Sequence, residues 1–182
     1  DEVFSRNYEE GILTAYRDLP EADVIIFNIG NRPAHWGDMP KKLGYLDLMH
    51  VASWQISFKR ESIVNNNVYF DEHMGAGSGN GAEEEFRFLT DCRKNGLAIY
   101  YVPFVIADVA QTKSTWFKGY NEEFFINRGN TTRYIMGYVP AVLYAAYYSI
   151  RKRHQFDSDI SWFKAFRLIM KGIHENRLGK KK

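Results

Sequence analysis

Cysteine is almost absent from this chain of 182 residues, since Cys92 is the only one. A single cysteine excludes an intramolecular disulfide, and no CxxC or HExxH zinc signature is present. A chain without disulfides is compatible with a reducing compartment, so we expect a cytoplasmic location.

Long apolar segments are also lacking. The longest run without a charged residue covers residues 134–150, and its 17 positions include Gly137, Pro140 and five tyrosines. A membrane-spanning helix needs about 20 apolar residues, so this run is marginal for a span. Residues 161–178 carry apolar side chains at helical spacing, with basic side chains largely on the other face. The two segments predict an amphipathic helix hairpin lying in the membrane plane, and the alternative is that both helices pack on the rest of the protein.

Acidic residues are scarce in the last third of the chain. Residues 127–182 contain 12 Lys and Arg against 3 Asp and Glu, a net charge of +9, whereas residues 1–126 contain 12 against 19, a net of −7. We therefore divide the chain into a body, 1–126, and a basic, aromatic helical tail, 127–182. An anionic membrane surface at the inner face of the cell membrane is the expected partner of the tail. Nucleic acid is not expected, because the basic residues interleave with an apolar face and no RNP, KH or zinc motif appears.

The body alternates between helical and strand patterns. Residues 7–19 have helical spacing with Asn7 as a candidate N-cap, and the apolar, β-branched run 22–30 predicts a strand buried on both faces. A helix followed by a buried strand is typical of an α/β fold. The remaining expected elements are a loop over 31–50, a strand over 51–60, a short helix and turn over 61–72, a helix over 83–96 with Gly96 as its C-cap, and a strand over 97–109 broken by Pro103.

A glycine-rich stretch precedes three acidic residues at the start of a predicted helix. Residues 75–81 contain Gly75, Gly77, Gly79 and Gly81, and Glu83, Glu84 and Glu85 follow. Glycines allow a loop to fold closely around a polar ligand, and a carboxylate at a helix N-terminus can act as a general base toward a hydroxyl. The alternative is structural, because acidic residues often cap helices and glycine-rich loops are often linkers. No GK[ST] follows the glycines, which excludes a phosphate-binding P-loop.

The order of these features resembles family 2 glycosyltransferases of the bacterial polysaccharide type. The resemblance rests on residues 54–60, Phe70-Asp71-Glu72, the glycines of 75–81, Glu83-Glu84, Arg87 and Arg93, Gly96, and residues 99–103, followed by STWFKGYNEEFFINRG. It implies an α/β fold that corresponds to the C-terminal, acceptor-side half of a GT-A-like nucleotide-diphospho-sugar transferase. Most of the donor site would then be missing, and the fragment alone is expected to be inactive.

The resemblance also implies roles for individual residues in an inverting transfer of sugar from a nucleotide-sugar donor to a glycan or lipid-linked acceptor. Glu84 falls on the catalytic base, and Glu83 would position the acceptor or Glu84. The acceptor would bind at Gly75, Gly77, Gly79 and Gly81, with Trp116 stacking on a sugar ring. The alternative function is a non-catalytic module that binds a membrane surface.

A divalent cation, Mg²⁺ or Mn²⁺, is the cofactor that the resemblance implies. Asp1 would be the last fragment of the DxD-like metal motif. Gln111 stands where many family members carry a histidine, and glutamine binds divalent metals poorly compared with histidine or carboxylate.

Overall fold

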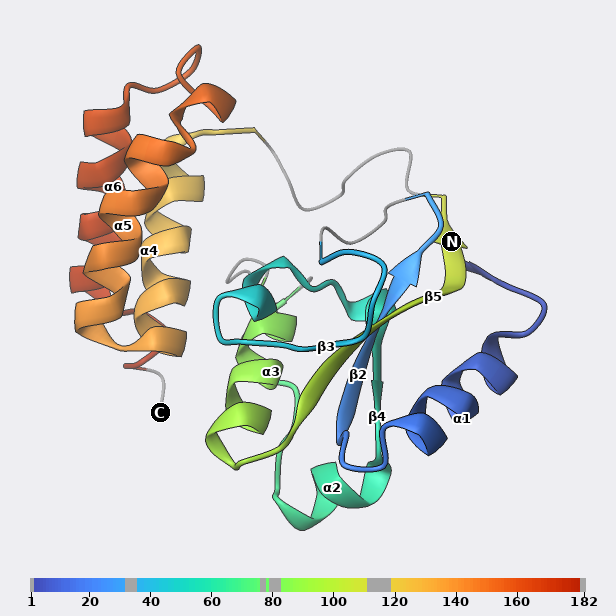
Figure 1. The fold of residues 1–182 in the computed structure, drawn as a ribbon. Coiled ribbons are helices and arrows are strands. Elements are labelled where there is room, and N and C mark those ends of the chain that lie inside the picture. Colours follow the sequence, from blue (N-terminus) through green and yellow to red (C-terminus); the bar gives the residue numbers. More distant parts are fainter. Residues whose placement is uncertain (1, 32–35, 76–77, 79–82, 111–118, 181–182) are drawn as a thin grey trace. The chain divides into compact units, whose positions relative to one another are not determined.

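The structure, a computed structural model, describes residues 2–31, 36–75, 78, 83–110 and 119–180. The chain forms two compact units (Figure 1). Unit 1 contains Asp1–Phe70 and Glu84–Lys113, and unit 2 contains Asp71–Glu83 and Ser114–Lys182. The chain therefore crosses between the units three times: it enters unit 2 after Phe70, returns to unit 1 after Glu83, and enters unit 2 again after Lys113. The boundary expected after residue 126 falls inside a helix of unit 2.

Unit 1 is a mixed α/β unit built on a five-stranded sheet with the order β1-β5-β2-β4. The buried strand predicted over 22–30 is β2 (Val24–Ile29), and its residues Val24 to Phe27 and Ile29 are fully buried. β2 pairs in parallel with β5 (Ile99–Val109) and antiparallel with β4 (Ile56–Phe58). The other edge of β5 pairs with β1 (Glu2–Phe4) and β3 (Lys41–Lys42). The predicted α/β class is thus confirmed.

Helices flank this sheet from opposite sides, with α1 (Tyr8–Asp18) on one side and α3 (Glu84–Lys94) on the other (Figure 1). Ile12 and Tyr16 of α1 pack against the core, but Leu13, which shares the predicted apolar face, is 65% exposed. Asn7 occupies the N-cap position of α1 without a capping hydrogen bond from its side chain. A short helix, α2 (Arg60–Asn65), follows β4, close to the helix and turn predicted over 61–72.

The predicted face of α3 is confirmed, since Phe86, Leu89 and Cys92 are all buried. The helix ends as predicted at Gly96, whose φ of 80° lies in the left-handed region that favours glycine. Backbone hydrogen bonds from Gly96 to Arg93 and from Leu97 to Cys92, both 3.0 Å long, close this end. Burial raises the pKa of the Cys92 thiol to about 12, helped by the nearby Asp91 and Asp23, so the thiol stays protonated.

Two sequence-based expectations for the strands are wrong. β5 continues through Pro103 instead of breaking there, because the pairing with β2 shifts: Val102 lies opposite Phe27 and Val105 opposite Asn28. Pro103, which lacks an N–H, therefore falls at an irregularity where no ladder bond is required.

The strand expected over 51–60 is short, because Ser53–Gln55 is a 3₁₀ helix and only Ile56–Phe58 are extended. Buried Gln55 donates from Nε2 to the carbonyl of Phe27 and accepts from the N–H of Ala52, at 3.1 and 3.0 Å. These bonds favour the helical turn over an extended strand. The loop expected over 31–50 contains β3 and a second 3₁₀ helix, Asp47–His50.

Unit 2 is a bundle of α4 (Glu122–Met136), α5 (Tyr138–Arg151) and α6 (Trp162–Glu175). Sequence analysis placed the first tail helix over 134–150, which is wrong at its start. Residues 134–136 belong to α4, and Gly137, with a φ of 86°, separates α4 from α5. Asn121 and Ser161 cap α4 and α6 by accepting from the N–H groups of Phe124 and Lys164.

The bundle core uses the apolar face that the sequence assigned to a membrane. Ile169 and Ile173 of α6 are buried in it, while Trp162 and Phe163, assigned to the same face, are 46% and 55% exposed. The other core residues include Phe125, Ala141, Ala145, Tyr148, Phe156, Ala165 and Leu168. The helices therefore pack against one another and use part of this apolar face for the bundle core, so the in-plane hairpin at a membrane stays a prediction. Within the described ranges, no helix combines the length and the apolar character that crossing a membrane requires.

Glycines bring α4 and α6 into backbone contact. A Cβ atom at Gly129 would clash with the carbonyl oxygen of Ile169, and one at Gly172 would clash with the carbonyl oxygen of Ile126. The two glycines thus sit reciprocally at one helix crossing. Because each obstacle is main chain, no side-chain rotation can make room for a larger residue.

Candidate functional site

The predicted catalytic carboxylates lie where the chain returns from unit 2 to unit 1. Glu83 is the last residue of the unit 2 segment, and Glu84 is the first residue of α3. Gly75 is buried and has a φ of 90°, which a residue with a side chain would adopt only under strain. The other predicted site residues, Gly77, Gly79, Gly81, Trp116 and Asp1, lie outside the described residues, as does Gln111.

Glu83 is held in an ion pair. Its Oε1 lies 3.1 Å from Nη1 of Arg128 on α4, and both side chains are largely shielded from solvent, with 25% and 20% exposed. Its φ of 86° is unusual for a residue with a side chain and costs roughly 1 kcal/mol or more. The ion pair offsets that backbone cost, so we interpret Glu83 as an anchor for the chain immediately before Glu84.

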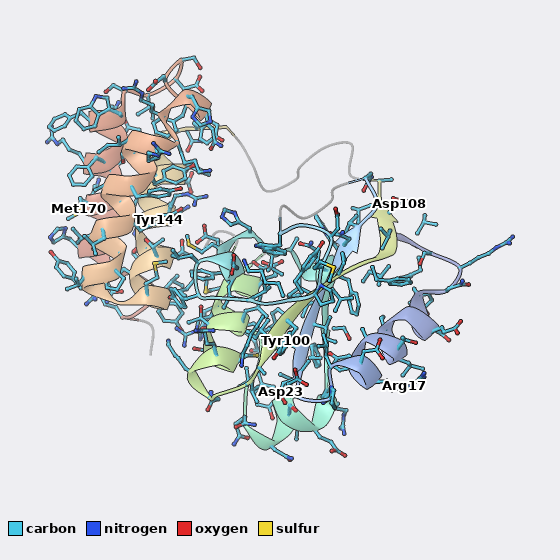
Figure 2. The ribbon with its side chains drawn as sticks, in the orientation of Figure 1. Arg17, Asp23, Tyr100, Asp108, Tyr144 and Met170 are labelled. Carbon is cyan, nitrogen blue, oxygen red and sulfur yellow. The ribbon has the colours of Figure 1, made fainter. Side chains whose placement is uncertain are left out.

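Aromatic side chains surround the guanidinium of Arg128. Nη1 donates to the hydroxyl of Tyr144, a residue labelled in Figure 2, over 2.7 Å. The guanidinium also lies over the rings of Phe124 and Tyr148, 4.9 and 4.6 Å from their centroids. Burial acts to lower the pKa of Arg128, but Glu83 and the two tyrosines outweigh it, so the pKa is raised. Arg128 therefore remains charged and joins α4, α5 and Glu83.

Removing the Arg128 charge is expected to destabilise unit 2. Arg128→Met leaves the partly buried Glu83 carboxylate without its cation, and we expect a loss of about 1–3 kcal/mol in the free energy of unfolding. Urea denaturation followed by circular dichroism measures this loss. Arg133→Met, on the same helix but facing Tyr138, is the matched control and should cost less. When Glu83 is already replaced by Gln, adding Arg128→Met should cost less free energy of unfolding than it does in the original protein. An equal cost in both proteins would contradict an interaction between Glu83 and Arg128.

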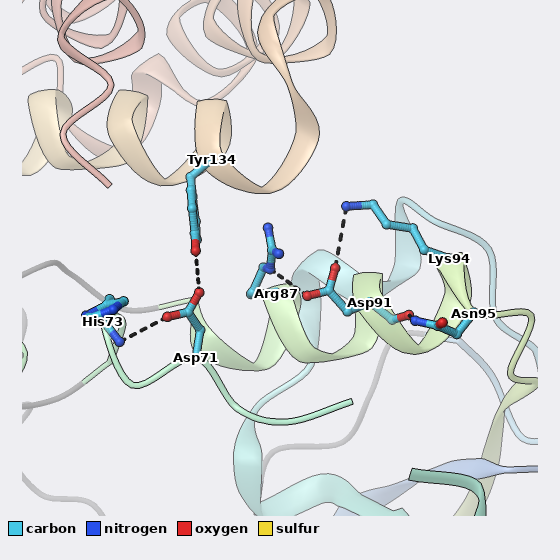
Figure 3. Close-up of polar contacts among 7 residues, drawn as sticks. All are labelled: Asp71, His73, Arg87, Asp91, Lys94, Asn95 and Tyr134. Atoms are coloured by element: carbon cyan, nitrogen blue, oxygen red, sulfur yellow. Dashed lines mark hydrogen bonds and ion pairs between the residues drawn. The ribbon is translucent and has the colours of Figure 1, made fainter. Parts of the chain in front are cut away.

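A second bond ties the other end of the same segment to α4. The hydroxyl of Tyr134 donates to Oδ2 of Asp71 over 2.5 Å, and Oδ1 of Asp71 accepts from the N–H of His73 (Figure 3). Asp71 and Glu83 are the first and last residues of the segment that contains the glycine-rich stretch. Helix α4 therefore holds this segment at both ends, through Tyr134 and Arg128.

Sequence reasoning missed Arg128 and Tyr134. The position of Arg128 beside Gly129 is the one local feature that sets it apart. Nothing in the sequence spacing indicates a partner near residue 83. The two arginines that carry the family resemblance have structural contacts instead. Nε of Arg87 pairs with Asp91 at 2.6 Å (Figure 3), and Nη1 of Arg93 donates to the carbonyl of Leu43 over 3.2 Å.

Glu84 differs from its two neighbours. It is half-buried at the first turn of α3, where the helix dipole favours negative charge. Its Oε2 is shielded from solvent and has no hydrogen-bond partner among the residues that the structure describes. Glu83 is paired with Arg128, and Glu85 accepts hydrogen bonds from the hydroxyl and the N–H of Ser53. Oε2 of Glu83 is shielded in the same way, but the other oxygen of Glu83 pairs with Arg128. Glu84 is therefore the carboxylate of the three that no described ion pair or hydrogen bond holds.

Glu85 gives the site a measurable pH dependence. Burial raises its pKa, and the nearby Glu84 raises it further, while the Ser53 hydrogen bonds oppose the shift. A carboxyl group with a raised pKa binds its proton more tightly in the folded than in the unfolded protein. Its contribution to stability is therefore present below the unfolded pKa and is lost as the pH rises through the folded pKa.

Glu85→Gln removes this titration, so the variant should gain stability relative to the original protein as the pH rises above the ordinary pKa of a glutamate side chain, about 4. The measurement is the free energy of unfolding of both proteins at several pH values. A difference that is constant with pH would contradict the assignment.

No metal centre is formed by the described residues. Within these ranges, no group of three or more His, Cys, Asp and Glu side chains is arranged to hold an ion. The two positions that sequence analysis connected with metal, Asp1 and Gln111, lie outside the described ranges. The metal expectation therefore stays a prediction, and no chemical step below is assigned to it.

No protein-family model matches the chain, and no curated protein matches it.

Proposed function

We propose that the protein is an inverting glycosyltransferase that moves a sugar from a nucleotide-sugar donor to a hydroxyl of a glycan or lipid-linked acceptor. The proposal includes a GT-A-like arrangement for unit 1 and a cytoplasmic location. The mixed sheet with helices on both sides, and the glycine-rich stretch that leads into an acidic helix start, support the fold. The single, buried cysteine fits a reducing compartment.

The observation that carries the proposal is the different environment of three consecutive carboxylates. Glu83 is neutralised by Arg128 and Glu85 is bonded by Ser53, whereas no described ion pair or hydrogen bond holds the Glu84 carboxylate, whose Oε2 is shielded from solvent. A buried carboxylate oxygen without a hydrogen bond is costly for stability, which favours a role that a ligand completes. The hydroxyl group of an acceptor sugar would donate the missing hydrogen bond.

In the proposed reaction, Glu84 accepts the proton of the acceptor hydroxyl as that oxygen attacks the anomeric carbon of the donor. The bond between the anomeric carbon and the phosphate oxygen breaks, and the nucleoside diphosphate leaves with the bonding electrons. Attack from the face opposite the leaving group inverts the anomeric configuration. Glu83 acts as a positioning residue, because its ion pair fixes the chain immediately before the base.

The test is sugar transfer by the protein as its gene encodes it. Nucleoside diphosphate release is measured with UDP-glucose, UDP-galactose, UDP-N-acetylglucosamine and GDP-mannose, with and without Mn²⁺, using glycans and lipids extracted from the source cells as acceptors. We expect acceptor-dependent release with one donor and, by NMR of the product, an inverted anomeric centre. Retention of configuration, or no acceptor-dependent release with any donor, would contradict the proposal.

A further inference from the structure

Large apolar side chains are exposed at the end of the bundle where α5 passes into α6. Tyr147 and Ile150 in the last turns of α5 are 52% and 54% exposed, and Trp162 and Phe163 in the first turn of α6 are 46% and 55% exposed. The rings of Trp162 and Phe163 contact each other, with centroids 5.8 Å apart. The core between these helices is already filled by buried residues such as Phe156 and Ile160. These four exposed side chains therefore add nothing to the bundle core.

Basic residues accompany them. Arg151, Lys152 and Arg153 directly follow Ile150, and Lys164 and Arg167 follow Phe163. Across residues 147–167 there are five Lys and Arg against two Asp, a net charge of +3. Among the described residues, Arg151 and Lys152 have no ion-pair partner, and Arg153 reaches Asp157 only at 4.0 Å, whereas Lys164 pairs with Glu122 of α4 at 2.6 Å. We call this region, defined by Tyr147, Ile150, residues 151–153, Trp162 and Phe163, the α5–α6 end.

We propose that the α5–α6 end docks on the surface of an anionic phospholipid bilayer. Trp162, Phe163 and Ile150 enter the boundary between headgroups and acyl chains, and residues 151–153 contact lipid phosphates. Tryptophan and tyrosine favour this boundary, and each Lys or Arg near an anionic surface strengthens binding. On α6 the apolar surface is limited to the first turn, because Ile169 and Ile173 are committed to the core. On α5, Leu143 and Val139, both 67% exposed, continue it toward the start of the helix.

The charge of the α5–α6 end argues against two other binding partners, a second copy of the chain and nucleic acid. A second copy of the chain would place the basic residues 151–153 of both copies against each other, which like-charge repulsion opposes. Nucleic acid would satisfy the basic residues but would leave Ile150 and Phe163 in contact with a charged backbone. A bilayer surface matches both the charge and the apolar side chains. This binding is separate from sugar transfer, and its test requires no sugar.

The test is flotation of residues 1–182 with lipid vesicles. We expect binding to vesicles of phosphatidylcholine mixed with phosphatidylglycerol, weaker binding at high salt, and little binding to phosphatidylcholine alone. Replacing Arg151, Lys152 and Arg153 together by Gln should lower the partition constant about 100-fold, and Trp162→Ser with Phe163→Ser should lower it at least about tenfold. All five side chains lie outside the core, so circular dichroism should show an intact fold.

Matched controls come from unit 1. Leu13→Ser replaces an apolar side chain that is 65% exposed, and Arg17→Gln removes an exposed cation from the same helix. Both should float as the original protein does. No flotation, equal binding to neutral vesicles, or undiminished binding by both patch variants would overturn the proposal. So would a finding that the same substitutions abolish a dimer or an oligonucleotide complex while vesicles are not bound.

Discussion

Replacing Glu84 by Gln is expected to slow sugar transfer by about 10²–10⁴-fold, the usual contribution of a general base. Glutamine has nearly the same shape as glutamate, but its amide does not take the proton of an acceptor hydroxyl. The change acts on the chemical step, so kcat should fall while KM for the nucleotide sugar stays near its original value. Initial rates of nucleoside diphosphate release by the protein as its gene encodes it measure both constants.

The neighbouring carboxylate provides the control. Glu85→Gln makes the same chemical change one position further along α3, at a side chain that Ser53 already binds. We expect Glu85→Gln to change the rate by a few-fold at most. Equal losses in both variants would indicate damage to the helix start rather than loss of a base, and a normal rate in Glu84→Gln would remove Glu84 from the mechanism.

The second large effect concerns stability. Gly129→Val is expected to destabilise unit 2 by about 3 kcal/mol or more, and Gly129→Ala by about 1–3 kcal/mol. Alanine in place of glycine inside a helix normally stabilises it by about 1 kcal/mol, so the expected sign is opposite to the intrinsic preference. The cause is the main chain of α6, because a Cβ atom at this position meets the carbonyl oxygen of Ile169. The two helices would have to separate, which loosens the core along their contact.

Urea denaturation of each variant measures this effect, with Gly172→Ala as the reciprocal substitution on α6. Lys171→Ala is the matched control, since it introduces the same residue one position earlier on the exposed side of α6. Its effect should stay within about 0.5 kcal/mol. A Gly129→Ala protein that is more stable than the original would show that the helix crossing tolerates a methyl group.

The elements best predicted from the sequence are those in which local pattern and tertiary packing agree. Phe86, Leu89 and Cys92 recur at helical spacing and are the residues that α3 buries, and Gly96 ends the helix because its backbone requires a positive φ. The buried strand β2 could be predicted from the sequence for the same reason. Its β-branched and aromatic residues Val24 to Phe27 suit a strand that is covered on both faces.

Helix α4 was not predicted, because its sequence does not look amphipathic. Asn130, Thr131 and Thr132 are polar yet buried in its second half, and Gly129 stands at its centre. Each polar side chain bonds a carbonyl of the preceding turn, as Asn130 does with Ile126 at 3.1 Å and Thr132 with Arg128 at 2.7 Å. Polar groups satisfied inside the helix can be buried at little cost, but they remove the apolar periodicity on which sequence-based assignment depends.

The candidate site also has a part that the sequence predicts and a part that it does not. Glu83 and Glu84 could be placed at a helix start from the adjoining residues, because acidic side chains in a first turn are a local feature. The partner of Glu83 could not, since Arg128 lies on a helix that the pattern did not reveal and no local rule connects the two positions. The difference in environment between Glu83 and Glu84 therefore emerged only from the three-dimensional contacts.

The bond between Asp71 and Tyr134 has a consequence for synthesis on the ribosome. Tyr134 follows Asp71 by 63 residues, so at roughly 5–20 residues per second it is added roughly 3–13 seconds later. The strands of unit 1 up to β4 emerge before this interval ends, whereas the segment Asp71–Glu83 must wait for α4 before it gains its partners. A nascent chain stalled before α4 would therefore leave Asp71 and Glu83 without the partners that Tyr134 and Arg128 supply.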